Sequence, residues 1–473
     1  MQEGRQHYNV TLAILTFAGL AYALQQTMVI PALVALQHDL GTTTTWVTWV
    51  LTVFLLVASV ATPILGKLGD QYGKERLLTI TLTIFLAGCI GAALAWNIWS
   101  LIAFRAVQGV GGAVFPLAFA IIRDEFPREK VGVAIGLISA VFGVGGGLGI
   151  VLSGLIVDHA SWRWLFIVGS IPTAIAVVLV HRFVPESPIK TESKVDFLGA
   201  TLMSLGLISL LVALTEGETW GWTSVRTLGL GAVSAAFLVA WGVAELHVDE
   251  PMVDMRMLAR REVLFTNITA LISGFAMFGS FVLVPNFVES IDSVVHYGFA
   301  ASATRAGLYL LPSSVLLLFA GPVAGLIGRR IGSKWPLAIG LAVVAVAAGM
   351  LAFWNDRPWQ VLAAMPLLGV GVGFAFASMA TLITEAVRPT ETGVATGMNT
   401  VMRTVGGVIG GQVGAALLSA YTVAGTGLPS VKGFEIAFAA SAVAALIGAG
   451  VAVFVTPPRF RRARLVIEPQ LSD

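Results

Sequence analysis

Apolar residues fill long windows along this chain, and short polar connections separate the windows. A window of roughly 18 or more mostly apolar residues is long enough for a helix to cross a hydrocarbon core of about 30 Å. Backbone polar groups inside lipid have no water to bond, so apolar runs of this length must be helices that satisfy their own hydrogen bonds. The pattern predicts fourteen membrane-spanning helices at residues 10–36, 46–66, 77–96, 99–122, 131–157, 163–184, 196–215, 227–246, 263–288, 305–327, 336–354, 359–384, 393–421 and 433–455.

The composition agrees with an all-α polytopic membrane protein. Of the 473 residues, 57% are hydrophobic and 11% are charged, and the mean hydropathy is +0.88. Soluble globular chains carry about 25% charged residues. The two notable polar segments, residues 185–195 and 247–262, are too short to fold as independent domains. We therefore expect no substantial soluble domain.

Charge and candidate chemistry exclude several functional classes. The formal net charge of +2 gives no reason to expect a nucleic-acid partner. The single cysteine, Cys89, lies in an apolar stretch and reads as a small buried apolar residue that forms no internal disulfide. The sequence offers no nucleophile–base set, metal-ligand cluster or phosphate-binding loop. We expect neither an enzyme nor a metal site or bound cofactor.

Lys and Arg residues are strongly skewed between the two sets of predicted loops. Most of the 28 fall on the side that carries both termini. Positive charge concentrates in cytoplasmic loops. The skew therefore predicts a multi-pass protein of the cell (inner) membrane with both termini cytoplasmic. The exceptions are Arg163, Arg226, Arg305, Arg357 and Lys432 on the other side, and Arg105 and Arg403 within spans.

Two glycine patterns occur twice in the chain. The spacing Pro63-x-x-Gly66-x-x-Gly69-x-x-x-Gly73 after the second span recurs after the tenth as Pro322-x-x-Gly325-x-x-Gly328-x-x-x-Gly332. The fifth span opens Gly132-Val-Ala-Ile-Gly136, and the thirteenth opens Gly393-Val-Ala-Thr-Gly397 at nearly the same offset. Two matches at nearly one offset indicate two homologous six-helix halves. Parallel halves of this kind place a substrate cavity between them near the bilayer midplane.

The repeat also predicts how the chain is divided. The seventh and eighth spans fall between the two halves as an inserted pair. The predicted parts are an N-terminal six-helix bundle at 1–184, a linker with two additional helices at 185–262, a C-terminal six-helix bundle at 263–458 and a basic cytoplasmic tail at 459–473.

Several ordered motifs carry a family resemblance over essentially the whole chain. The run Gly66-Lys-Leu-Gly-Asp-Gln-Tyr-Gly-Lys-Glu-Arg76 resembles the loop signature of the major facilitator superfamily, and Arg105-Ala-Val-Gln-Gly-Val-Gly-Gly112 resembles its second signature. The six-plus-two-plus-six spans, Ser161-Trp-Arg-Trp-Leu-Phe166 and Gly307-Leu-Tyr-Leu-Leu-Pro312 are similar to the fourteen-span drug:proton antiporter family. This resemblance implies the major facilitator fold and export of small amphipathic molecules by alternating access, driven by the proton gradient.

The chain departs from that family at two places. An acidic residue often lies midway along the first span of the family, where this chain has Gln25 and Gln26. The family's fifth span usually carries a proline within its glycine run, and the run from Gly143 to Gly147 has none.

The segment after the second span is the first candidate site. Its glycines permit tight turns and close approach of backbones. Asp70 can face a neighbouring helix N-terminus, which favours a carboxylate by about 0.3–1 kcal/mol, and Lys74 or Arg76 can share it. The resemblance implies a cytoplasmic gate that closes in the outward-facing state, and the alternative is a solvated loop whose charges only set orientation. The predicted gate loop comprises Gly66, Gly69, Asp70, Gly73, Lys74 and Arg76.

The second candidate site is a polar cavity between the halves. A charge at depth costs at least about 2.5–3.5 kcal/mol, so Arg105 should face the interior, where Gln108 lies one helical turn away. Arg403 receives the same argument, and Glu289 is the nearest candidate for a titrating acid. The alternatives are a structural arginine bonded to backbone carbonyls and a snorkelling interfacial glutamate. The predicted cavity and coupling residues are Arg105, Gln108, Gln25, Gln26, Glu289 and Arg403.

The third candidate is an interface on which the halves rock. Small residues four apart let helices approach closely and slide, and they occur at matching positions of the fifth and thirteenth spans. The alternative is static packing. The predicted interface residues are Gly143, Gly145, Gly146, Gly149, Gly406 and Gly410.

Together these features predict a secondary transporter that acts as a monomer in the lipid bilayer on small amphipathic substrates. Two cavity arginines without an obvious cavity acid favour neutral or anionic substrates over dications. The alternatives are an exporter of an endogenous lipid or metabolite and a transport-inactive membrane receptor or scaffold.

Overall fold

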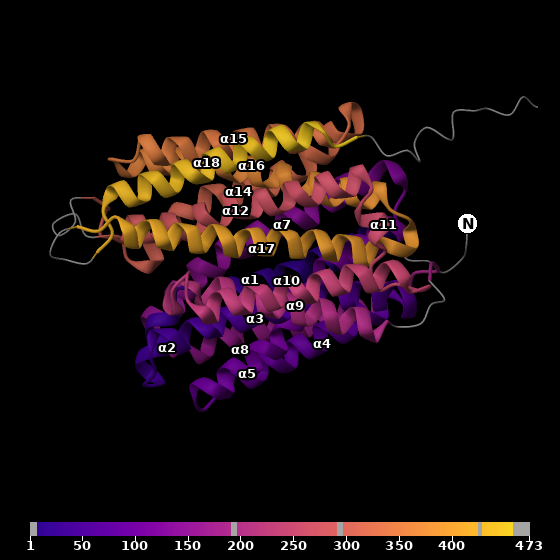
Figure 1. Ribbon diagram of the computed structural model, residues 1–473, viewed down its shortest axis with the longest axis horizontal. Helices are drawn as coiled ribbons and strands as arrows, with labels where there is room; N and C mark the ends of the chain where they lie inside the picture. The colour runs from indigo at the N-terminus through magenta and orange to yellow at the C-terminus, as the bar shows by residue number, and fades with distance from the viewer. Residues whose placement is uncertain (1–6, 191–195, 291–296, 424–427, 457–473) are drawn as a thin grey trace, which may run out of the picture.

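The computed structural model describes residues 7–190, 196–290, 297–423 and 428–456, so the predicted tail at 459–473 lies outside the described residues. Fourteen helices of the described part are long and apolar enough to cross a membrane, and they lie side by side in one bundle (Figure 1). The described residues contain no β-strand, and one isolated β-bridge joins Thr422 to Pro429. The predicted all-α membrane fold with fourteen helices is confirmed.

The first six spans form one half of the bundle, drawn in indigo and purple in Figure 1. The fourth span is interrupted by one turn of 3-10 helix, and a short helix follows the first span. The helices are α1 (Tyr8–Thr27), α2 (Leu33–Asp39), α3 (Thr44–Tyr72), α4 (Lys74–Ala93), α5 (Ile98–Gly109), η1 (Val110–Ala113), α6 (Val114–Glu125), α7 (Arg128–His159) and α8 (Arg163–Phe183).

An inserted helix pair and the second half follow. The last helices of the chain, orange to yellow in Figure 1, lie together on the opposite side of the bundle from α4, α5 and α8. The helices are α9 (Phe197–Trp220), α10 (Val225–His247), α11 (Met255–Leu258), α12 (Arg261–Glu289), α14 (Ala303–Ile331), α15 (Lys334–Phe353), α16 (Pro358–Ala386), η2 (Pro389–Glu391), α17 (Thr392–Ala420) and α18 (Val431–Val453).

The first two spans differ from the predicted ranges. The span predicted at 10–36 is two helices, because Pro31 lacks a backbone N–H and disfavours helical geometry in the residue before it. The apolar pattern continues across this break and hides it. The span predicted to end at residue 66 continues as helix to Tyr72, so part of the predicted gate loop is helical.

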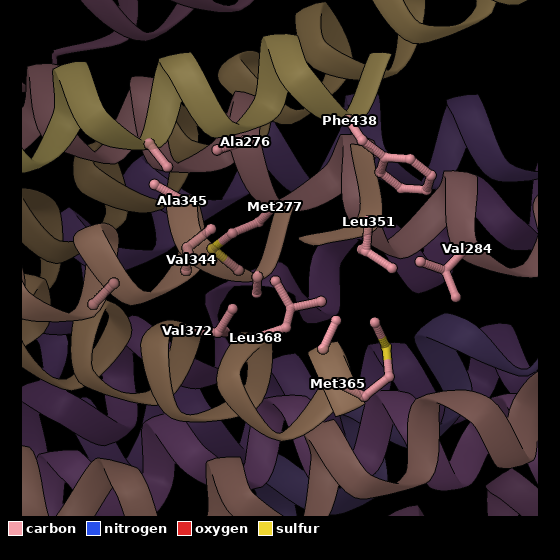
Figure 2. Close-up of a cluster of buried hydrophobic side chains, with 14 of the residues drawn as sticks. Ala276, Met277, Val284, Val344, Ala345, Leu351, Met365, Leu368, Val372 and Phe438 are labelled. Atoms are coloured by element: carbon pink, nitrogen blue, oxygen red, sulfur yellow. The ribbon is translucent and has the colours of Figure 1, made fainter. Parts of the chain in front are cut away.

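Apolar side chains close each half from within. In the second half, Met277 of α12, Val344 of α15, Leu368 of α16 and Phe438 of α18 meet in one buried cluster (Figure 2). Each of these side chains is at most 4% exposed. Burial of a side chain of this size stabilises the fold by about 1.5–3 kcal/mol in water, whereas in lipid close packing takes over that role.

The inserted pair covers the line along which α3 meets α17. Met203 of α9 and Trp241 of α10 share a buried cluster with Leu56 of α3 and Val401 of α17. Helix α9 therefore bridges the two halves on one side of the bundle, and α10 packs on α9.

The repeated glycines make two equivalent crossings between the halves. A methyl group at Gly66 of α3 would lie 2.6 Å from the carbonyl carbon of Gly393 in α17. A methyl group at Gly325 of α14 would lie 2.7 Å from the carbonyl carbon of Gly132 in α7. Gly66 corresponds to Gly325 in the sequence repeat, and Gly393 corresponds to Gly132. The same backbone-to-backbone contact is therefore made twice, and each half contributes one glycine of each kind.

Candidate functional site

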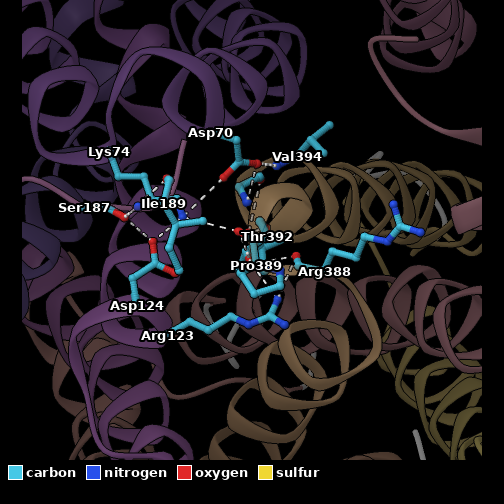
Figure 3. Close-up of polar contacts among 12 residues, drawn as sticks. Asp70, Lys74, Arg123, Asp124, Ser187, Ile189, Arg388, Pro389, Thr392 and Val394 are labelled. Carbon is cyan, nitrogen blue, oxygen red and sulfur yellow. Dashed lines mark hydrogen bonds and ion pairs between the residues drawn. The ribbon is translucent and has the colours of Figure 1, made fainter. Parts of the chain in front are cut away.

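Asp70 joins the two halves at the end of the bundle where α3 ends and α4 begins. We call this the basic end, because the loops on its side carry most of the Lys and Arg residues. Asp70 is fully buried, and its Oδ2 accepts hydrogen bonds from the amides of Gly393 at 2.9 Å and Val394 at 3.3 Å (Figure 3). These amides open α17, and the first turn of a helix has unsatisfied N–H groups and a partial positive charge. A carboxylate from one half therefore caps a helix of the other.

Lys74 lies beside Asp70 without any exposed side-chain surface. Its Nζ is 3.7 Å from Asp70 Oδ1, forms an ion pair with Asp124 of α6 and donates a hydrogen bond to the Pro389 carbonyl at 3.4 Å. The side chains of Asp70 and Asp124 are also fully buried. Charges removed from water are costly unless they are paired, and here Lys74 lies between two carboxylates, each of which has one hydrogen-bonded oxygen.

Arg123, next to Asp124 on α6, makes the third connection across the halves. Its guanidinium donates hydrogen bonds to the Thr392 hydroxyl at 2.6 Å and to the carbonyls of Val387 and Arg388 at 2.5 and 3.1 Å (Figure 3). These acceptors lie where α16 turns into α17. We call Asp70, Lys74, Arg123 and Asp124 the charged cluster. Sequence reasoning missed Arg123 and Asp124, which end a different span from the motif.

The predicted gate loop is only partly a loop. Gly66 and Gly69 lie inside α3, where they permit close packing against α17 and Leu117 of α6. Gly73 is the turn itself, with a φ of 119° that favours glycine. Arg76 is exposed and does not share Asp70, because its side chain points to the surface of α4. Asp70 and Lys74 are the predicted residues that the structure brings together.

Glu186 supports the turn between α3 and α4, and sequence reasoning missed it as well. Its carboxylate accepts hydrogen bonds from the amides of Glu75 at 3.2 Å and Arg76 at 3.3 Å, the first turn of α4. A methyl group at Gly73 would lie 2.6 Å from the Glu186 carboxyl carbon, so the glycine makes room for this cap. The neighbouring Ser187 donates a hydrogen bond to Asp124. The segment after α8 thus fastens both α4 and the charged cluster.

Replacing Glu186 with alanine should lower the free energy of unfolding by about 0.5–2 kcal/mol, because two N-terminal amides of α4 lose their acceptor. Unfolding in a detergent titration measures the change. The control is Glu129→Ala, which removes an exposed first-turn carboxylate of α7 that makes no hydrogen bond among the described residues, and should cost a few tenths of a kcal/mol. Equal losses in the two variants would contradict the capping role.

Arg105 and Gln108 are bonded to each other inside the first half. Arg105 is fully buried, donates from Nε to the Val50 carbonyl at 3.1 Å and stacks 4.2 Å from the ring centre of Phe54. Arg105 therefore has the glutamine partner that the sequence predicts. It also makes a bond to a backbone carbonyl, as expected for the alternative of a purely structural arginine. Neither residue lines the cavity between the halves described below, and a role in coupling stays a prediction.

Three further predicted cavity residues lie elsewhere. Gln25 is fully buried against Gly169 of α8 within the first half, because it occupies the face of α1 that meets α8. Gln26 is partly buried beside it, and its Oε1 has no hydrogen-bond partner among the described residues. Glu289 is exposed as the last residue of α12, since Phe287 and Val288 take the inward positions.

Arg403 is the member of the predicted set that lines the cavity described here, which lies between the halves. Helices α6 and α7 of the first half and α16 and α17 of the second half line this cavity. The volume of the cavity that is open to the centre of a water-sized sphere is about 10 Å³, which is room for one water molecule. Its lining residues are Phe115, Phe119, Ser139, Phe142, Phe376, Ala380, Thr396, Asn399, Thr400 and Arg403.

The predicted rocking interface divides between two faces. Gly143 packs on Leu317 of α14 in the other half. Gly145, Gly146 and Gly149 instead pack on α1 within their own half. Residues two apart on a helix point about 200° away from each other, so Gly143 and Gly145 cannot serve one interface.

Gly406 and Gly410 also pack within their half. Methyl groups at these positions would lie 2.7 Å from the Leu271 carbonyl carbon and 2.8 Å from the Phe275 Cα of α12. Backbone atoms of the two halves meet at Gly66, Gly132 and Gly136 and their partners in the repeat, whereas Gly143 meets a side chain of the other half. No group of three or more potential metal ligands occurs among the described residues.

Comparison with known proteins identifies the family. The family model for the Major Facilitator Superfamily matches residues 15–411 and 266–469. Multidrug resistance protein 3 of Bacillus subtilis (strain 168) is 32% identical over 380 residues, 79% of this chain and 72% of the relative. The Tetracenomycin C resistance and export protein of Streptomyces glaucescens is 27% identical over 374 residues, 77% of this chain and 68% of the relative. The crystal structure of the human organic anion transporter MFSD10 (TETRAN) shares the fold, with a TM-score of 0.65, 15% identity and coverage of 95% of this chain and 100% of that one. The chain therefore belongs to the Major Facilitator Superfamily of membrane transporters.

Proposed function

We propose that this transporter exports small amphipathic molecules by alternating access and uses the proton gradient as its energy source. The charged cluster is the observation that carries the proposal. It ties the two halves together at the basic end, while the cavity that holds Arg403 lies between the same halves. Alternating access needs a contact of this kind, which closes one end of a cavity and can be released.

Two further observations support the substrate class and the orientation. Relatives that match most of the chain are named for multidrug resistance and for tetracenomycin C resistance and export. The basic end carries most Lys and Arg residues, which favours the cytoplasmic side of the cell membrane for that end and for both termini. We propose a monomer as the functional unit, with the lipid bilayer as its surroundings and no nucleic-acid partner.

Everted membrane vesicles with an acidic interior test the proposal. Addition of an exported substrate should dissipate the proton gradient, which a pH-sensitive dye reports. Substrate uptake that leaves the proton gradient intact would contradict proton coupling. Absence of any substrate movement would favour the receptor or scaffold alternative, and selective movement of a phospholipid would favour a lipid exporter.

Asp70→Asn should slow substrate-driven proton movement at least about tenfold at equal expression. The amide keeps an oxygen acceptor but loses the negative charge that faces the N-terminus of α17 and Lys74, and hydrogen bonds to a charged group contribute about 1.5–3 kcal/mol. Asp39→Asn is the control, because Asp39 has a half-exposed side chain on α2 away from the cluster. An unchanged rate in Asp70→Asn would rule out the cluster as a gate.

A further inference from the structure

Arg403 reaches into the cavity between the halves without a protein partner for its donors. Its guanidinium lies 4.2 Å from the ring centre of Phe376 and 5.7 Å from that of Phe142. A guanidinium carries five N–H donors and no acceptor. Within the described residues, no group accepts a hydrogen bond from Arg403 or forms an ion pair with it. The donors are therefore left for a molecule that enters the cavity.

The other two arginines inside the bundle are bonded to the protein. Arg123 donates to three acceptors at the basic end, and Arg105 donates to the Val50 carbonyl and the Gln108 side chain. Burial of an arginine is costly in lipid, and structural arginines meet that cost by such bonds. Arg403 instead has aromatic faces on two sides, which stabilise a cation but leave its edge donors free.

A second polar group faces the same cavity from the opposite half. Ser139 of α7 is 3% exposed, and its hydroxyl has no hydrogen-bond partner among the described residues. Serines and threonines in helices usually donate to the carbonyl one turn back, as Thr396 and Thr400 of the same cavity do. The amide of Asn399 is already bonded to Asn267 at 2.9 Å. Ser139 and Arg403 are thus the two lining residues whose side chains donate no hydrogen bond among the described residues, whereas Asn399 has used one of its two donors.

The charge of the cavity selects against cations. None of its lining residues is an aspartate or glutamate. A cationic substrate would place a second positive charge near Arg403 without a counter-charge in a site of low dielectric constant, whereas an anion would neutralise the arginine. Guanidinium forks bind carboxylates and sulfonate-like oxyanions with two parallel hydrogen bonds. The phenylalanines that line the rest of the cavity suit an aromatic or apolar body.

We propose that Arg403 is the specificity-determining residue of this cavity and that the substrate is an amphipathic organic anion. Its carboxylate or sulfonate accepts hydrogen bonds from Arg403 of one half and Ser139 of the other, and its apolar body packs on the phenylalanines. Because the two donors belong to different halves, the bound anion holds the halves together. The cavity as it stands admits about one water molecule, so the halves must separate before the substrate enters. This assignment rests on the proposed export function, since it takes the cavity to be the substrate path.

Equilibrium binding to the purified full-length protein, in micelles of an uncharged detergent, tests the assignment. The probe is 1-naphthalenesulfonate, and 1-naphthalenemethanol is its neutral counterpart with the same ring system. Arg403→Gln should weaken binding of the sulfonate at least about tenfold and change binding of the alcohol little, since a hydrogen bond to a charged group is what it loses. Arg403→Lys should fall between the wild type and Arg403→Gln, because it keeps the charge and loses the fork.

Two more variants complete the binding series. Ser139→Ala should weaken sulfonate binding a few-fold. This variant still tests the proposal if Arg403→Gln does not elute as a folded protein in gel filtration. Arg226→Gln, at an exposed position at the start of α10, should bind both probes like the wild type. Equal loss of both probes in Arg403→Gln, no loss, or no sulfonate binding by the wild type would overturn the proposal. Displacement of the sulfonate by phosphatidylglycerol at lower concentration than by free organic anions would overturn it in favour of a lipid headgroup.

Transport separates failure of this assignment from failure of the proposed function. Everted vesicles should accumulate the sulfonate with the wild type and at least about tenfold more slowly with Arg403→Gln. Export of the cation ethidium at equal rates by both would leave the export function intact and overturn the anion assignment. Sulfonate binding that depends on Arg403 without any transport would support the anion site and contradict the export function.

Discussion

Gly66→Ala should abolish most transport, whereas Gly349→Ala should leave it unchanged. The added methyl group at Gly66 would lie 2.6 Å from the carbonyl carbon of Gly393 and overlap its oxygen, so α3 and α17 must move apart. Backbone atoms cannot rotate away as a side chain does, and overpacking of this kind costs about 1–3 kcal/mol. The added methyl group at Gly349, within α15, meets no atom within 4 Å.

The position of Gly66 makes this cost functional. Asp70 lies one helical turn further along α3, and its carboxylate binds the amide of Gly393 itself. Separation of the helices at Gly66 therefore also lengthens the bonds of Asp70. The state closed at the basic end should lose about 1–3 kcal/mol relative to the open state, a shift of roughly 5- to 150-fold in their ratio.

Labelling and transport measure the two consequences of Gly66→Ala. In a Cys89→Ser background, a Ser187→Cys reporter should react with a maleimide several-fold faster in Gly66→Ala, because Ser187 is buried beside the charged cluster in this structure and we expect opening of the basic end to expose it. Gly325→Ala repeats the change at the equivalent crossing of α14 with α7. Transport and labelling that match the Gly349→Ala control would show that close approach at this crossing is dispensable.

The helices could be predicted from the sequence because one property decides them. A segment in lipid must be apolar and long enough, and both are read directly from composition. The break after Thr27 could not be read in this way, because the residues on either side of Pro31 remain apolar. The helical end of α3 was missed for the opposite reason. Its glycines and charged residues are typical of a loop, and the sequence does not show the helices against which they pack.

The candidate site could be predicted only where a local rule applied. A carboxylate beside glycines at a helix end indicates a helix N-terminus nearby, and Asp70 does lie at one. The helix it meets, α17, begins more than three hundred positions later, and no local pattern specifies that partner. Asp124 and Glu186 were missed for the same reason: each is an ordinary acidic residue until the fold brings it to Lys74 or to α4.

The glycines show a second limit of sequence reasoning. Spacing alone placed Gly143 and Gly145 on one interface, while the helix directs them to α14 and α1. A GxxxG pattern predicts a close contact but not the helix that makes it. The repeat does not remove this limit. Gly66 with Gly393 and Gly325 with Gly132 occupy matching positions and meet across the halves, whereas Gly145 and Gly406 match equally well and pack within their own halves.

Lys74→Met should be among the most destabilising single substitutions in the chain, with an expected loss of about 3–5 kcal/mol in the free energy of unfolding. The substitution removes the cation that lies between Asp70 and Asp124, whose side chains are fully buried. Asp70 retains the amides of α17 and Asp124 retains Ser187, but neither bond supplies a full positive charge. Two buried carboxylates would then be left with Arg123 as the remaining cation of the charged cluster, so much of the cost of an uncompensated buried charge appears.

A second substitution should restore much of that stability. In Lys74→Met/Asp124→Asn the charge that lost its partner is also removed, so the double variant should be more stable than Lys74→Met alone. Titration with a denaturing detergent measures both, and the double-mutant cycle gives the coupling energy of the pair. Lys67→Met is the control, because Lys67 is partly exposed and, among the residues that the structure describes, donates only to the Pro251 carbonyl at 3.1 Å. Such a bond contributes about 0.5–1.5 kcal/mol. A loss of stability in Lys74→Met no larger than that in Lys67→Met would show that Lys74 does not hold the two carboxylates together. The contact between the halves at the basic end would then depend on Arg123 and on the cap on α17.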